Sequence, residues 1–119
     1  MLTDFGKALR KMRIDHGEFL RDMAAKLNVT VAYLSAVENG RREVPDNWIG
    51  ELANQYKLSN EEQKELQEYA YERKDSLKID LSGIQAEEKE LALAFARTFK
   101  NLSEEDKKRM RDIFDKGEE

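Results

Sequence analysis

The stretch that most constrains the fold of this chain is residues 27–42, which read LNVTVAYLSAVENGRR. Asn28 is of a type that tolerates a left-handed turn, and Thr30 can cap a helix that begins directly after it. Gly40 can end that helix, and two arginines follow it. The stretch therefore predicts a tight turn, a short helix and a basic exit.

The short helix has two chemically different faces. Leu34 and Val37 are three residues apart, so they share one apolar face. The other face carries the small side chains of Val31, Ala32, Ser35 and Ala36. A helix with a small outer face and arginines at its exit suits a large anionic surface, and we interpret this surface as the major groove of DNA.

Two amphipathic helices are expected before this stretch, at residues 4–15 and 20–27. In both of them apolar residues recur at helical spacing. Phe19 stands where the second helix should be capped, and its side chain cannot accept a hydrogen bond, so that helix start is either weak or held by packing. Two short helices joined by a tight turn form the helix-turn-helix pattern.

Two further helices complete a first domain, residues 1–75. The first of them follows Pro45 and has an apolar stripe that begins at Trp48. The sequence from Ser59 to Glu62 is a capping box, and it opens a helix that extends to about residue 74.

Residues 76–119 form a C-terminal extension, and its first residues no longer have helical periodicity. Apolar and charged residues alternate between residues 76 and 84, which predicts either a short strand that pairs with another subunit or an extended linker packed on the helices. Helices at 85–100 and from 103 to about 115 then form a hairpin too small to have a core of its own.

The hairpin carries an apolar stripe that something must cover. Its members are Leu91, Phe95, Phe99, Met110 and Phe114, with Ile113 also expected to point inward. The first domain or a second subunit could supply the cover, and a homodimer interface is the leading expectation.

Composition excludes several classes of function. The chain has no cysteine, which excludes disulfides and thiolate catalysis and fits a cytoplasmic protein. No signal peptide is visible, and no apolar run approaches the roughly 20 residues that span a bilayer. With no nucleophile–base pair, phosphate loop or ligand cluster, we expect neither an enzyme nor a metal or cofactor site.

Charge is unevenly distributed along the chain. Residues 1–45 hold eight basic and six acidic residues, whereas residues 46–119 hold 13 basic and 19 acidic residues. A DNA-facing front and a solvated or partner-facing back would have this distribution, although the basic surplus is small.

The motifs resemble the lambda-repressor-like helix-turn-helix family, also called the XRE or Cro-like family. The resemblance covers about Phe5 to Ala70. It rests on elements at fixed mutual spacing: Arg13, Gly17, Met23-Ala24, Leu27 to Thr30, Tyr33 to Ser35, Val37 to Arg42, and Pro45. It implies an all-α fold with a five-helix DNA-binding domain, here followed by a helical hairpin.

The resemblance also implies a DNA-binding site. Its residues are Leu20, Arg21, Thr30, Val31, Ala32, Tyr33, Ser35, Ala36, Asn39, Arg41 and Arg42. Thr30, the start of the preceding helix and the exit loop would meet phosphates, and the small outer face would meet bases. Tyr33 either contacts the DNA backbone or covers the junction with the next helix. In relatives, the residues that match Arg13 and Glu38 form an ion pair between helices.

Three departures from the family pattern change what is expected of the site. Val31 and Ala32 stand where relatives often carry amide side chains, and apolar groups can touch only a thymine methyl. Leu20 replaces a common glutamine that donates to phosphate. Asp46 stands where some relatives reach the minor groove with a basic residue. Specificity should therefore depend more on DNA shape and dimer spacing.

These features predict a sequence-specific transcriptional regulator. A homodimer would bind a pseudo-palindromic operator in double-stranded DNA and repress prophage, mobile-element or own-operon promoters. The alternative is an antitoxin-type protein that neutralises a partner toxin through residues 76–119 and represses its own operon. The acidic back half suits a basic protein partner.

Overall fold

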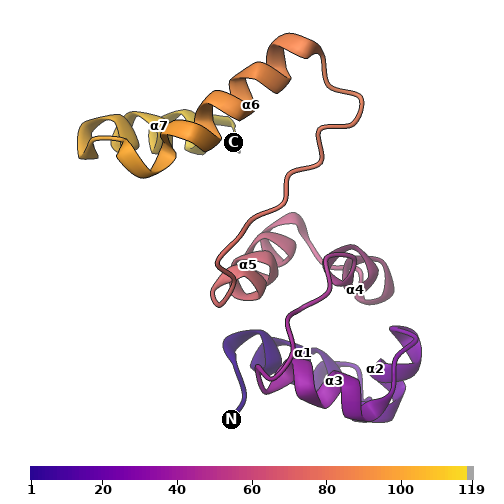
Figure 1. Cartoon of the computed structure of the whole chain (residues 1–119). Helices are drawn as coiled ribbons and strands as arrows, with labels where there is room; N and C mark the ends of the chain where they lie inside the picture. The colour runs from indigo at the N-terminus through magenta and orange to yellow at the C-terminus, as the bar shows by residue number, and fades with distance from the viewer. Residues whose placement is uncertain (118–119) are drawn as a thin grey trace. The chain divides into compact units, whose positions relative to one another are not determined.

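The structure is a computed structural model and describes residues 1–117. These residues are helical with no strand, and they divide into two compact units at residue 77 (Figure 1). The first unit holds α1 (Asp4–Asp15), α2 (Leu20–Lys26), α3 (Val31–Glu38), α4 (Trp48–Tyr56) and α5 (Asn60–Tyr71). The second holds α6 (Ala86–Thr98), the 3₁₀ turn η1 (Phe99–Asn101) and α7 (Glu104–Gly117). The predicted all-α class and five-helix domain are confirmed.

The turn before α3 and the exit after it have the predicted backbone. Asn28 is left-handed at φ 56°, and the Thr30 hydroxyl caps α3 by accepting a hydrogen bond from the Tyr33 N–H at 3.0 Å. Gly40 follows the helix at φ 75°. A left-handed backbone is easily accessible to glycine and tolerated by asparagine, so both ends of α3 are encoded locally.

The start of α2 is held by a group that sequence reasoning missed. Phe19 occupies the N-cap without a side-chain cap, as expected. The carboxylate of Asp22 instead accepts a hydrogen bond from the Phe19 N–H at 2.7 Å. This bond is the second half of a capping box, in which the residue at the third helical position reaches back to the cap.

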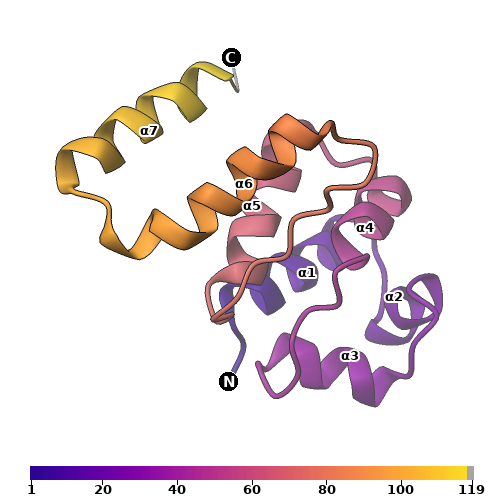
Figure 2. The same cartoon turned by 45° about the horizontal axis from the view of Figure 1, so that its top comes forward.

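The core of the first unit draws on all five helices. Its buried apolar residues are Phe5, Leu9, Met23, Ala24, Leu27, Leu34, Val37, Val44, Trp48, Leu52, Tyr56, Leu66 and Ala70. Helix α1 packs against both α3 and α5, while α2 packs on α3 and α4 on α5 (Figure 2). The core thus holds α3 by one face and leaves the other face free.

The second unit corrects two expectations. Residues 76–84 form no strand, so the segment is an extended linker, in which Leu77 and Ile79 are exposed and Leu81 and Ile84 are half-buried. Neither α6 nor α7 contains a buried residue. Met110 and Phe114 line a hollow of the hairpin with Phe95 and Phe99, as expected, although Phe114 is 56% exposed. Ile113 is 64% exposed and does not line the hollow, so the expectation that it points inward is wrong. The second unit is too small to enclose these apolar side chains.

The described helices include none with the length and apolar character of a membrane span.

Candidate nucleic-acid interface

Helix α3 presents its small residues to solvent. Leu34, Val37 and Glu38 are buried against the core, whereas Val31 is 44% exposed and Ala32 is also exposed. Ser35 and Ala36 are half-buried at the edges of the free face. The outer face predicted from helical spacing is therefore exposed at Val31 and Ala32 and half-buried at Ser35 and Ala36.

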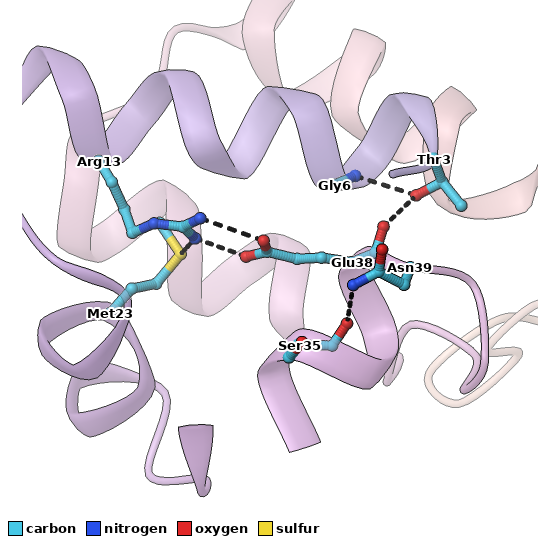
Figure 3. Close-up of polar contacts among 7 residues, drawn as sticks. All are labelled: Thr3, Gly6, Arg13, Met23, Ser35, Glu38 and Asn39. Atoms are coloured by element: carbon cyan, nitrogen blue, oxygen red, sulfur yellow. Dashed lines mark hydrogen bonds and ion pairs between the residues drawn. The ribbon is translucent and has the colours of Figure 1, made fainter. Parts of the chain in front are cut away.

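A buried ion pair ties α3 to α1. The Arg13 guanidinium donates two hydrogen bonds to the Glu38 carboxylate, at 2.5 and 3.1 Å, and Nη1 also lies 3.3 Å from the Met23 sulfur (Figure 3). The two side chains are only 9% and 4% exposed. This is the pair that the family resemblance implied. A two-point contact of this kind fixes the rotation of α3 about its axis as well as its position.

The C-terminal end of α3 is held by the start of the chain. The Glu38 carbonyl oxygen accepts hydrogen bonds from the Thr3 backbone N–H at 3.0 Å and the Thr3 hydroxyl at 3.1 Å (Figure 3). The Asn39 side-chain amide donates to the Ser35 carbonyl at 2.8 Å. Asn39 therefore satisfies the helix end with its amide, and only its second N–H is left for a phosphate.

Tyr33 covers the junction between α3 and α4, which is one of the two roles expected for it. Its half-buried ring meets the Trp48 ring edge-on, with ring centroids 6.1 Å apart. The Arg42 guanidinium carbon lies 5.2 Å from the centre of the Tyr33 ring, a cation–π distance. Tyr33 thus positions Arg42 beside the helix.

The structure separates the two residues expected at the start of α2. Leu20 is half-buried and packs on the core. Arg21 is exposed, and its guanidinium carbon lies 5.0 Å from the centre of the Phe19 ring. Arg21 is therefore the cation that this helix start offers, together with its backbone N–H groups.

A cationic cleft beside the α3 exit was not predicted. It has a volume of about 300 Å³, and Arg41, Arg42, Arg73 and Lys74 contribute to its lining. Lys74 Nζ donates to the Val44 carbonyl at 2.9 Å and lies 3.4 Å from an Asp46 oxygen. No local spacing could reveal the cleft, because the end of α5 reaches the α3 exit only through the packing of the helices.

A polar cluster fixes the turn between α1 and α2 against α4. Lys26 Nζ lies 2.6 Å from Glu18 Oε2 and 4.5 Å from the centre of the Tyr56 ring. Burial raises the pKa of Glu18, but the Lys26 ammonium and the nearby Tyr56 hydroxyl outweigh it, so that the pKa is lowered. Burial, and then the nearby Glu18 carboxylate, raise the pKa of the Tyr56 hydroxyl. The cluster therefore favours an ionised Glu18 and a neutral Tyr56.

Comparison with known proteins agrees with this geometry. A family model described as a helix-turn-helix domain matches residues 4–66, from the first residue of α1 into α5. No curated protein and no solved structure matches the chain. The matched residues are more than half of the chain and include α2, the turn and α3. The protein therefore belongs to the family of helix-turn-helix domains.

Proposed function

We propose that this protein is a sequence-specific DNA-binding transcriptional regulator that represses a promoter by occupying it. The observation that carries the proposal is the orientation of α3, whose buried face is pinned by Leu34, Val37 and the Arg13–Glu38 pair. Its free face carries only small side chains, so it can enter the major groove, which admits an α-helix.

Phosphate contacts on both sides of α3 would position it in the groove. Thr30 lies at its N-terminus, where backbone N–H groups and the helix dipole favour an anion. Arg41 and Arg42 follow its C-terminus and are exposed, as is Arg21 at the start of α2. These groups carry affinity and register rather than sequence information.

Base recognition is expected to be modest. Val31 and Ala32 can contact a thymine methyl, but they make no hydrogen bond to a base edge. Ser35 is the one side chain among the four on this face that has a hydroxyl. Selected sites should therefore be defined by thymines at a few positions and by DNA shape.

A homodimer formed through the second unit would increase the sequence specificity of DNA binding, because it would recognise two half-sites. Leu91 is 72% exposed, Phe99 is 51% exposed and Phe114 is 56% exposed, although all three are large and apolar. A second copy would cover this face and place two α3 helices about 34 Å apart on a pseudo-palindromic operator.

An antitoxin-type role is the second candidate. The acidic surplus of residues 46–119 suggested a basic partner for the second unit, but most of that surplus lies outside this unit. Residues 78–119 hold nine basic and eleven acidic residues, whereas residues 46–77 hold four basic and eight acidic residues. The acidic surplus thus belongs mainly to α4, α5 and the residues around them. Co-purification of a small basic protein through the second unit would support this candidate.

Binding-site selection from random duplexes at stated salt tests the proposal directly. We expect a pseudo-palindromic site to be enriched. Arg42→Ala should weaken binding to selected and random duplexes alike and lower the salt slope by about one unit, because it removes one phosphate contact.

A matched control removes a charge elsewhere on the first unit. Lys57→Asn is suitable because Lys57 is exposed and left-handed at φ 52°, which asparagine tolerates. It should leave the slope unchanged. Failure of the wild-type protein to bind any duplex at low salt would refute the proposal.

A further inference from the structure

We infer that the cleft between the exit of α3 and the end of α5 is a further phosphate site for the DNA backbone, with Arg73 as its main cation. This inference rests on the proposed DNA-binding function and extends the site to a segment outside the helix-turn-helix motif. It assigns a binding role to the turn that follows α5, which lies beyond the matched residues 4–66.

The lining of the cleft is strongly unbalanced in charge. It consists of Thr3, Phe5, Val37, Gly40, Arg41, Arg42, Glu43, Val44, Tyr69, Ala70, Arg73 and Lys74. Four of these side chains are cationic and one is acidic. Cations that converge on one concavity attract an anion, because their repulsion is relieved when the anion binds.

Arg73 is placed in the cleft by a close approach to Gly40. A Cβ atom added at Gly40 would lie 3.2 Å from the guanidinium carbon of Arg73, and closer still to its Nη1. The same Cβ would lie 3.0 Å from the Thr3 side chain. Gly40 thus has two roles: it supplies the left-handed turn after α3, and it leaves room for the Arg73 guanidinium beside that turn.

The donors of Arg73 are free to bind a ligand. Within residues 1–117, no acidic side chain forms an ion pair with Arg73, and its side chain makes no hydrogen bond. The adjacent Lys74 is different, because its charge is shared by Asp46 and the Val44 carbonyl. A guanidinium presents a planar fork of N–H donors that matches two phosphate oxygens. Arg73 is therefore the cation of the cleft best able to grip a phosphate.

The form of the cleft favours a phosphate within a polymer over a free ion. Arg41, Arg42 and Arg73 are all exposed, and the one cation held deep in the lining, Lys74, is already paired. Exposed cations hold a small ion weakly, since water competes for each donor. A DNA strand that already lies on Arg41 and Arg42 delivers the next phosphate at high effective concentration. Figure 2 shows that the end of α5 reaches the chain start and the α3 exit.

The test is the salt dependence of DNA binding by the full chain, with a random-sequence duplex and the selected site as probes. We expect Arg73→Ala to lower the slope of log affinity against log salt by about one unit and the affinity by about eightfold at 0.1 M salt. The loss should be equal for both duplexes, because a phosphate contact carries no sequence information. Arg73→Lys should keep the slope, and Lys57→Asn is the control for the lost charge.

The outcomes separate this inference from the proposed function. If Arg73→Ala keeps the wild-type slope while Arg42→Ala lowers it, the inference is wrong and the proposed function stands. If the wild-type protein binds no duplex, both are wrong. Titration of inorganic phosphate into the DNA-free protein tests whether the cleft binds a free phosphate ion instead. The inference is overturned if the protein binds this ion tightly, Arg73→Ala abolishes that binding, and the same variant leaves the salt dependence of DNA binding unchanged. Circular dichroism of each variant confirms that it is folded.

Discussion

At the scale of single residues, two polar contacts hold helices of the first unit together. The Arg13–Glu38 pair joins α1 to α3, and the Glu18–Lys26–Tyr56 cluster joins the α1–α2 turn to α4. The Arg13–Glu38 pair is buried, so each of its charges depends on its partner for the interactions that water would otherwise give, whereas Glu18 and Lys26 are half-buried.

We predict that Arg13→Ala or Glu38→Ala lowers the free energy of unfolding by about 3–5 kcal/mol, because each leaves a buried charge without its partner. The double variant Arg13→Met, Glu38→Leu should lose much less, since it leaves no buried charge. Urea unfolding of the three variants measures the difference. Similar losses for the single and double variants would mean that packing, not charge, explains the contact.

Glu18 should make the stability depend on pH. Its pKa is lowered from the ordinary value of 4.5 in the folded protein. Its contribution is therefore complete above that ordinary value and is lost as the pH falls through the lowered folded value. Unfolding measured between about pH 7 and pH 3 should show a smaller decline for Glu18→Gln than for the wild type. Parallel declines would contradict the prediction.

At the scale of elements, the approach of α1 to α3 depends on the absence of a side chain. A Cβ added at Gly6 would lie 2.9 Å from the Glu38 carbonyl carbon and 3.0 Å from its Cα. These are backbone atoms, so they cannot rotate away as a flexible side chain would. The N-terminal turn of α1 can therefore pack on the end of α3 only with glycine at this position.

We predict that Gly6→Ala destabilises the protein by about 1–3 kcal/mol, although alanine is the better helix former, because the two helices must move apart. Gly50→Ala is the matched control: it lies in α4 and has no atom within 4 Å of an added Cβ. It should raise stability by about 0.5–1 kcal/mol. Thermal unfolding of both variants gives the comparison, and equal effects would refute the packing argument.

At the scale of the whole molecule, the two units differ in what they bury. All buried apolar residues found in the described part of the chain belong to the first unit. The second unit has exposed leucines on α6 and exposed phenylalanines on η1 and α7, and none of its described residues is buried. An exposed apolar face of this kind is typical of an interaction surface.

Truncation after residue 77 should leave a folded monomer, because the core is intact. We predict that this fragment unfolds cooperatively and binds the selected pseudo-palindromic site with the affinity of a half-site. Light scattering coupled to size exclusion measures the mass. In the full chain, Phe99→Asp should abolish dimerisation without lowering the stability of the first unit, since Phe99 is exposed. A dimeric fragment would place the interface elsewhere.

The sequence determined the elements and the exposed face of α3. Helical spacing and local caps predicted each helix to within a few residues, because a cap, a left-handed asparagine and a glycine act on their own neighbours. Spacing also assigned Leu34 and Val37 to the core and Ala32 to solvent, since a helix has a fixed period. The Arg13–Glu38 pair followed from resemblance alone, because its residues are distant in sequence.

Only the tertiary structure decided which distant groups meet. Packing of α5 against α1 brings Arg73 to Gly40, and the fold places Lys74 on Asp46 and Tyr33 on Trp48. Strand periodicity at residues 76–84 failed as a guide, because alternation produces a strand only where a partner strand supplies hydrogen bonds. Local structure is encoded by neighbours along the chain. A binding cleft is formed by contacts between helices, and a local sequence pattern does not predict those contacts.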